Sequence, residues 1–207
     1  MHDAARKTDK ADSSRTRILD AAASLFRNNG YAAVSMRAIA AAAGMKAGSV
    51  YYHFESKETI VVEILDIGIT AVREEVGRTI ENLPTDVSPD QTIRAAILAH
   101  LRVLFEFSDY TSANVRIYGQ VPLPARRANL KVRRDYEALW ERILERIAEQ
   151  GGVRADVDLK AFRLMLIGSL NATLEWFDTK RGNLAELADG YADIMLHGLL
   201  PHVELDP

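Results

Sequence analysis

The apolar positions of this chain recur at helical spacing along almost its whole length, and no stretch shows the strict alternation of a half-buried β-strand. The pattern therefore predicts an all-α fold with about nine helices. Three short helices are expected near the N-terminus, and six further helices are expected to pack as a bundle. We predict a flexible tail over 1–13, a small helical domain over 14–58 and the bundle over 59–207.

In the small N-terminal domain, the residues that start and end helices are spaced as in a helix-turn-helix unit. A first helix is expected to start near Ser14 and to end at Asn28, where Asn-Asn-Gly supplies a left-handed C-cap. Ser35 is a good N-cap for a second helix, which Gly44 stops after two turns. A third helix, over 47–54, follows almost at once. Two short helices joined by about four residues that include a glycine form the helix-turn-helix arrangement.

Caps also mark the later helices. Ser88, with a proline next to it and Gln91 at the third position, predicts a capping box. Asp156 or Asp158 is expected to start the helix before the last one, and Asn183 the last helix. The six bundle helices are expected over 57–80, 89–107, 112–120, 124–150, 159–177 and 184–200.

The composition is that of an ordinary soluble globular protein, with 48% hydrophobic and 27% charged residues among 207. There are no cysteines, so neither a disulfide framework nor a thiolate metal site is available. The N-terminal segment lacks the apolar stretch of a secretory signal, and no run approaches the roughly 18 apolar residues of a membrane span. We therefore expect a cytoplasmic protein without a membrane partner, a metal or a cofactor.

The net charge of −3 hides an asymmetry along the chain. Residues 1–60 hold nine Lys or Arg against six Asp or Glu, whereas residues 61–207 hold 17 against 23. The excess of positive charge therefore falls on the helix-turn-helix unit. Such charge attracts a phosphate backbone, although scattered cations are also common on any solvated face.

The third helix carries an unusual run of aromatic and polar side chains. At about 100° per residue, Val50 and Phe54 fall on one face and are expected to pack inward. Gly48 and Tyr52 fall on the opposite face, with Ser49 beside them. A face that starts small and broadens to aromatic rings with polar tips suits a DNA major groove. Packing of the tyrosines between this unit and the bundle is the alternative that the pattern leaves open.

From Arg17 onward, the sequence RILDAAASLFRNNGYAAVSMRAIAAAAGMKAGSVYYHFESKETI closely resembles the N-terminal domain of the TetR family of bacterial transcriptional regulators. The shared features are an A-x-x-L-F helix, a following G-Y, a short helix with I-A, a turn glycine, G-S-x-Y-x-H-F and then K-E. The resemblance implies a homodimer that binds double-stranded operator DNA and is released by a small-molecule effector. The predicted function is therefore a ligand-responsive transcriptional regulator, most often a repressor in this family.

Carried over position by position, the resemblance implies DNA contacts from the second helix, the turn, the third helix and the start of the fourth. The residues concerned are Ser35, Met36, Arg37, Lys46, Ala47, Gly48, Ser49, Tyr51, Tyr52, His53 and Lys57. Lys57 matches the lysine that contacts a DNA phosphate in the family. Ala47 and Gly48 offer no side-chain hydrogen bonds. Base reading is therefore expected to rest on Lys46, Ser49 and the tyrosines.

In the TetR family the last two helices of each subunit typically form the dimer, which corresponds to 159–177 and 184–200 here. The first of these helices has more apolar surface than the core of one subunit needs. The predicted interface residues are Leu166, Ile167, Leu170, Leu174, Phe177, Tyr191 and Met195. A two-fold dimer would hold two recognition helices roughly 34 Å apart or somewhat more, matching a pseudo-palindromic operator.

An effector pocket between bundle helices is expected to be mostly apolar with a few polar groups. The candidate lining residues, each of which could instead be plain core, are His100, Leu104, Phe107, Tyr118, Trp140, Leu144, Met165, Asn171 and Trp176. Residues 174–199 are similar to the C-terminal region of TetR regulators that answer to acyl-CoA or fatty acids. The cationic stretch over 124–136 either meets the phosphates of an acyl-CoA or forms a solvated helix face.

Catalysis has little support in the sequence. Its five histidines are scattered, and there is no H-E-x-x-H, no phosphate-binding glycine loop and no serine elbow. We therefore predict that the protein is not an enzyme. A sequence-indifferent DNA binder, or a ligand-binding bundle with a vestigial DNA head, are the alternatives.

Overall fold

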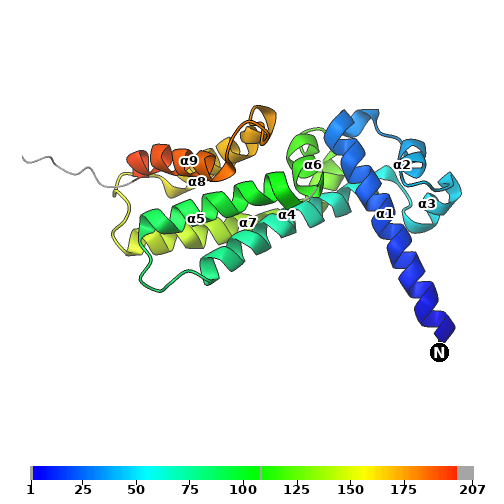
Figure 1. Ribbon diagram of the computed structural model, residues 1–207, viewed down its shortest axis with the longest axis horizontal. Coiled ribbons are helices and arrows are strands. Elements are labelled where there is room, and N and C mark those ends of the chain that lie inside the picture. Colours follow the sequence, from blue (N-terminus) through cyan, green and yellow to red (C-terminus); the bar gives the residue numbers. More distant parts are fainter. Residues whose placement is uncertain (1, 108, 200–207) are drawn as a thin grey trace, which may run out of the picture. The chain divides into compact units, whose positions relative to one another are not determined.

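A computed structural model describes the backbone of residues 2–107 and 109–199 and the side chains of residues 12–106 and 109–196. Within these residues the chain forms nine α-helices and no strand, as the hydrophobic pattern predicts (Figure 1). The helices are α1 (His2–Ala33), α2 (Met36–Ala42), α3 (Ala47–His53), α4 (Lys57–Glu81), α5 (Pro89–Arg102), α6 (Asp109–Ile117), α7 (Leu123–Glu149), α8 (Leu159–Ala172) and α9 (Leu184–Leu199). Across the same described residues, none of the helices is long and apolar enough to cross a membrane.

Helix α1 is longer than the sequence predicts at both ends. Its backbone is helical from His2, where we expect a flexible tail, and it continues to Ala33. Gly30 interrupts it with φ 77° and ψ 170°, a conformation that is open essentially to glycine alone. The Asn-Asn-Gly sequence therefore bends the chain at the predicted place, but a short helical segment follows the bend.

Side-chain caps fix where several helices begin. The Oγ of Ser88 accepts from the backbone N–H of Gln91 at 3.2 Å, and Oε1 of Gln91 accepts from the backbone N–H of Ser88 at 3.2 Å, which confirms the predicted capping box. Asp158, rather than Asp156, caps α8. Helix α5 passes into a π-helix and α8 into a 3-10 turn, so both α-helices are shorter than predicted.

The chain divides into two compact units, and the first contains the described residues up to Ile69 together with 109–132. It includes α1, α2, α3, α6 and the adjoining parts of α4 and α7. Helix α1 packs along α6, and α2 packs against both α1 and α3. The largest fully buried side chains of its continuous apolar core are Phe26, Ile18, Ile39, Ile60, Ile64, Leu65 and Ile117.

This first unit is larger than the domain over 14–58 that the sequence predicts. It also contains the first part of α4 and all of α6, because these two helices come very close at Gly68. A Cβ atom at Gly68 would lie 2.6 Å from the carbonyl oxygen of Tyr110. Nδ2 of Asn114 donates to the carbonyl oxygen of Leu65 at 2.6 Å in the same contact. Helix-capping residues do not report contacts between distant helices, so a domain boundary predicted from them misses this packing.

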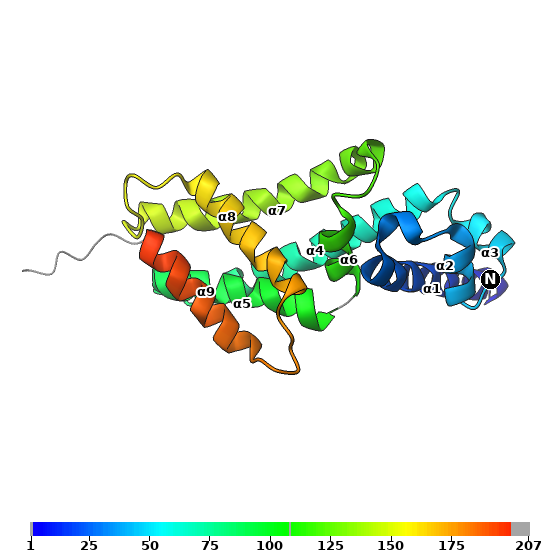
Figure 2. The same cartoon turned by 90° about the horizontal axis from the view of Figure 1, so that it is seen from above.

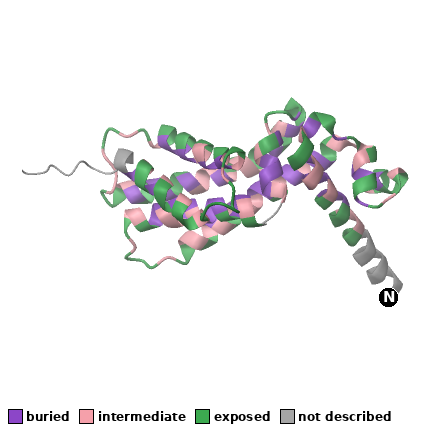
Figure 3. Cartoon of the chain, turned by 45° about the horizontal axis from the view of Figure 1, so that its top comes forward, coloured by how far each residue is buried: buried purple, intermediate pink, exposed green. Residues whose placement is uncertain are grey.

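The second unit contains 70–107 and 133–199, with α5, α8, α9 and the remaining parts of α4 and α7. Helix α5 lies beside α9 and also contacts α8 (Figure 2). Arg94 of α5 pairs with Asp90 at 2.9 Å, and with Asp189 and Asp193 of α9. Buried residues form stripes on the helices of this unit and exposed residues cover their other faces (Figure 3).

Candidate nucleic-acid interface and effector region

Helix α3 is anchored by two buried side chains. Val50 is fully buried, and Phe54, the residue that ends the helix, is 3% exposed; both belong to the core of the first unit. On the other side of the helix, Tyr52 is 82% exposed and Tyr51 is 53% exposed. The helical spacing therefore predicts correctly which face is inward and which is outward, and neither tyrosine is a buried packing residue.

The exposed face of α3 broadens from small residues to aromatic ones. Gly48 and Ser49 are exposed, and no atom lies within 4 Å of the place where a Cβ of Gly48 would be. The rings of Tyr52 and His53 meet edge to face, with centroids 5.2 Å apart and planes at 87°. Another surface can thus approach the first turn closely, while the second turn presents hydroxyl and imidazole groups that form hydrogen bonds.

The other predicted DNA contacts divide into exposed and core-facing residues. Arg37 and Lys46 are exposed. Ser35 caps α2, with its Oγ accepting from the backbone N–H of Ala38 at 3.2 Å. Met36 and Ala47 are partly buried and pack against the core of the unit. Only part of each of these last two side chains is therefore available to a partner.

Lys57 has an environment that differs from the one the resemblance implies. Its Nζ donates to the carbonyl oxygens of Tyr31 and Val34, each at 2.9 Å, and lies 4.0 Å from the centroid of the Tyr31 ring. The Tyr31 hydroxyl donates to Oε1 of Glu58 at 2.7 Å, and this bond lowers the pKa of the Glu58 carboxyl. The ammonium of Lys57 is therefore directed at the protein and is engaged there, because two backbone carbonyls lie within its reach.

A buried polar cluster lies in the second unit around His100. Its Nδ1 lies 2.5 Å from the Tyr136 hydroxyl, and its Nε2 lies 3.2 Å from Oδ1 of Asn171. Complete burial lowers the pKa of His100 to about 4, and the hydrogen bond to Asn171 opposes this only partly. The imidazole is therefore neutral at pH 7. Because Oδ1 can only accept, Nε2 carries the proton, and Nδ1 accepts from the tyrosine hydroxyl.

Several other predicted effector residues lie buried in the same unit, namely Leu104, Trp140 and Leu144. The Nε1–H of Trp140 is a buried donor that forms no well-aligned hydrogen bond, although it lies close to the Tyr136 hydroxyl. Burial raises the pKa of Tyr136, and the nearby Trp140 indole opposes that shift. Sequence reasoning missed Tyr136, although its spacing of four and eight residues from Trp140 and Leu144 places all three on one face of α7.

Three of the predicted effector residues whose side chains are described do not join this cluster. Met165 is 65% exposed and Trp176 is 58% exposed, so both point away from the core of the unit. Tyr118 belongs to the first unit, where it packs against that unit's core and lies 5.9 Å from the Arg126 guanidinium. The side chain of Phe107 lies outside the described residues. Helical spacing failed for α8 because this helix is apolar on two faces, and only one of them can face the core.

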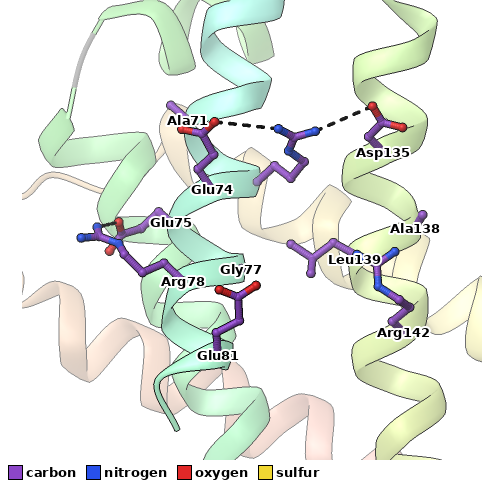
Figure 4. Close-up of a pocket in the computed structure, with 11 residues that line it drawn as sticks. Ala71, Glu74, Glu75, Gly77, Arg78, Glu81, Asp135, Ala138, Leu139 and Arg142 are labelled. Atoms are coloured by element: carbon purple, nitrogen blue, oxygen red, sulfur yellow. Dashed lines mark hydrogen bonds and ion pairs between the residues drawn. The ribbon is translucent and has the colours of Figure 1, made fainter.

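A groove of about 890 Å³ lies between α4 and α7 within the second unit (Figure 4). No predicted effector residue lines it. Arg73 pairs with Glu74 at 3.8 Å and with Asp135 at 3.7 Å, so part of its charge is neutralised within the groove. Leu139 points into it from α7 (Figure 4). In the part of the chain that the structure describes, no group of three metal-ligating side chains comes together.

The structure corrects the predicted dimer face of α8. Leu166 and Leu170 are fully buried inside the unit and are not available to a second chain. The outward face of α8, which we call the α8 stripe, consists of the exposed residues Ala161, Leu164, Met165, Gly168 and Ala172. The other predicted interface residues, which are partly buried, are Ile167, Leu174, Phe177, Tyr191 and Met195. Beyond the stripe, Ile194 of α9 is 73% exposed, and the rings of Trp176 and Tyr191 stack with centroids 6.5 Å apart.

These features define a helix-turn-helix DNA-binding unit joined to a helical bundle that has its own buried polar cluster. Residues 18–64 match the family described as bacterial regulatory proteins, tetR family, and residues 86–199 match the tetracyclin repressor-like C-terminal domain. The chain therefore belongs to the tetR family, as its sequence motifs predict. It is a DNA-binding transcriptional repressor of this type.

The similarity extends over most of the chain. The chain is 30% identical over 200 residues to the HTH-type transcriptional repressor KstR2 of Rhodococcus jostii (strain RHA1), and the match covers 91% of this chain and 92% of that relative. It is 24% identical over 193 residues to the fatty acid metabolism regulator protein of Bacillus subtilis (strain 168), covering 88% and 93%.

Two solved structures share the fold at lower identity. AibR in complex with isovaleryl coenzyme A and operator DNA matches with a TM-score of 0.75 at 22% identity, covering 91% of this chain and 98% of that one. FadR from Bacillus subtilis in complex with stearoyl-CoA matches with a TM-score of 0.74 at 20% identity, covering 88% and 98%. At these identities the likeness establishes the fold.

Proposed function

We propose that this protein binds a pseudo-palindromic operator as a homodimer, represses transcription there, and is released by an acyl-CoA. The observation that carries the DNA part is the outward face of α3, where Tyr52 is 82% exposed opposite a fully buried Val50. The seven residues of α3 span about 10 Å and fit a major groove about 12 Å wide. Gly48 and Ser49 then approach the base edges, and the tyrosine hydroxyls reach bases or phosphates.

The charge of the helix-turn-helix segment supports the same role. No acidic residue occurs between Met36 and Phe54, whereas this segment contains Arg37 and Lys46. Both cations are exposed. A duplex approaching α3 therefore meets only neutral and positive side chains from this segment, which favours binding to phosphates.

The exposed apolar residues of the second unit support a homodimer. Met165 and Leu164 of the α8 stripe and Ile194 of α9 are each more than half exposed, and exposed large apolar side chains favour contact with another protein surface. Gly168 has no atom within 4 Å of a Cβ position, so a second helix can come close there. A two-fold contact through this surface would bury the same stripe from both copies.

The buried polar cluster of the second unit supports an effector with a hydrogen-bond acceptor. Tyr136, Asn171 and Trp140 place hydrogen-bonding groups around His100 in an otherwise apolar core, and the thioester carbonyl of an acyl-CoA is an acceptor that such groups could bind. The similarity to the fatty acid metabolism regulator of Bacillus subtilis and to the two structures with bound acyl-CoA also supports an acyl-CoA as effector. Release would require the effector to bind the two DNA-reading states with different affinity, typically by about 1–3 kcal/mol.

The test begins with an operator selected from random duplexes by the wild-type protein. Light scattering should then give two chains per selected duplex or a multiple of two. Stearoyl-CoA or isovaleryl-CoA should release the duplex, whereas coenzyme A without an acyl group should not. Failure to enrich any sequence would indicate a sequence-indifferent binder, and release by none of the acyl-CoAs would refute the proposed effector class.

A further inference from the structure

One lysine joins the two ends of the helix-turn-helix segment. Val34 lies two residues before α2 begins, and Lys57 is the first residue of α4, four residues after α3 ends. The Nζ of Lys57 donates to the carbonyl oxygen of Val34 at 2.9 Å, across 23 positions of sequence. The chain that leads into α2 and the chain that leaves α3 are therefore held together at a single ammonium group.

Tyr31 forms the other half of this junction. Its ring lies 4.0 Å from Nζ of Lys57 and stacks on Phe26, with centroids 5.8 Å apart. Its carbonyl oxygen accepts from Lys57 at 2.9 Å, and its hydroxyl donates to Glu58 at 2.7 Å. Its backbone N–H donates to Oε1 of Gln120 at 3.0 Å. The first two residues of α4 are thereby fixed to a residue that Phe26 and Gln120 also hold in place.

The hydrogen bonds of Lys57 leave little for a phosphate. An ammonium has three N–H donors, and two of these are given to backbone carbonyls. Moving the group to a DNA phosphate would take the donor away from Val34 and Tyr31 and remove the cation from the tyrosine ring. Arg37 and Lys46 differ from Lys57 because both are exposed and, among the described residues, neither side chain forms a hydrogen bond or an ion pair.

We propose that Lys57 is a positioning residue for DNA recognition. It fixes how α2 and α3 are held against the start of α4, so that the outward face of α3 is presented in one geometry, and it does not itself bind phosphate. The family resemblance assigns this lysine to the phosphate backbone, and the two roles differ in a measurable way. Losing a phosphate contact lowers the slope of log affinity against log salt by about 0.9, whereas losing a positioning contact leaves that slope unchanged.

The first experiment measures affinity for the selected duplex over a series of salt concentrations. Lys57→Met should bind about tenfold more weakly at every salt concentration, with the wild-type slope, because two hydrogen bonds and a cation–π contact are lost. Arg37→Gln and Lys46→Gln are the matched controls, and each should reduce the slope by about 0.9. A reduced slope for Lys57→Met, or an unchanged affinity, would overturn the proposal. Thermal unfolding establishes that each variant is folded under the binding conditions.

A second experiment uses the wild-type chain and therefore does not depend on the folding of a variant. Reductive methylation followed by peptide mass spectrometry reports the reactivity of each lysine with and without the operator. Lys46 should react readily in the free protein and become protected by DNA. Lys57 should react slowly in both states. If Lys57 reacts like Lys46 when free and is protected to the same extent on DNA, the ammonium binds phosphate and the proposal fails.

Discussion

Helices α3 and α8 are each anchored by one buried face, yet their exposed faces have opposite chemistry. In α3, Val50 is fully buried while the exposed face carries Ser49 and Tyr52. In α8, Leu166 is fully buried while the exposed face carries Leu164 and Met165. The inner faces follow one rule, the burial of aliphatic side chains. The outer faces therefore carry the information about partners.

The two outer faces suit different surfaces for a physical reason. Burying the aliphatic α8 stripe against a second protein surface gains roughly 25 cal/mol per Å² and leaves no polar group unpaired. Burying Tyr52 and Ser49 against an apolar surface would leave their hydroxyl groups without hydrogen-bond partners, whereas base edges and phosphates supply such partners. The difference in side-chain chemistry between the two helices therefore supports the proposed roles, α3 in DNA binding and α8 in dimer formation.

The largest expected effects come from one substitution on the inner face of α8 and one on its outer face. Leu166→Ala should lower the free energy of unfolding by about 2–5 kcal/mol, because it opens a cavity in the core of the second unit. Met165→Asp should give a folded monomer, because it places a charge in the α8 stripe. Urea unfolding and sedimentation measure the two outcomes.

Lys160→Glu is the control for this pair, since Lys160 is exposed on α8 outside the stripe. It should remain a stable dimer. If Met165→Asp remained a dimer, the outer face of α8 would not be the dimer interface. If Leu166→Ala were as stable as the wild type, the inner face would not be part of the core.

The next effect in size is acid destabilisation of the unit that contains α8. The pKa of His100 is about 4 in the folded protein against an ordinary value of 6.5, so the unfolded chain binds a proton more readily. Stability should therefore be complete above pH 6.5 and should fall as the pH drops towards 4, by at most about 3 kcal/mol. Urea unfolding at pH 7 and pH 4.5 measures this loss.

His100→Gln isolates the contribution of the histidine, because glutamine keeps hydrogen-bonding groups but does not titrate in this range. The variant should lose less stability than the wild type between the same two pH values. Equal losses would mean that other groups cause the acid sensitivity. Among the side chains that the structure describes in the first unit, no histidine is buried, so amide exchange should show this unit responding less.

A smaller effect separates folding from DNA binding on the outer face of α3. Gly48→Leu should stabilise α3 by roughly 0.5–1 kcal/mol, because leucine is a better helix former and the site has open space. The same variant should bind the operator at least about tenfold more weakly, because its side chain blocks the close approach to the bases. Thermal unfolding and an operator titration check the two directions together. Unchanged binding would show that the first turn of α3 does not approach DNA.

The sequence predicts correctly the features that depend on neighbours in the chain. The capping box at Ser88 and the inward turn of Val50 are set within one or two helical turns, so periodicity and cap chemistry suffice. The TetR motif also predicts the family. What could not be predicted is the inward face of α8, because Leu166 and Met165 are both apolar and only tertiary packing chooses between them.

Long-range contacts account for the other differences. The bonds of Lys57 reach back 23 and 26 positions, and no local pattern encodes them. The polar cluster of His100 joins three helices through Tyr136 and Asn171, which lie 36 and 71 positions away. Membership of α6 in the first unit rests on the close approach at Gly68. Each of these depends on which helices meet, which a single sequence leaves open.

The claim that the outer face of α3 reads DNA is tested most directly by the operator affinity of Tyr52→Ala, set beside that of Leu123→Ala. Both side chains are large and exposed in the first unit, but only Tyr52 lies on α3. We predict that Tyr52→Ala loses about 1–3 kcal/mol of specific operator binding at an unchanged melting temperature, while Leu123→Ala binds like the wild type. Wild-type affinity in Tyr52→Ala would contradict the account.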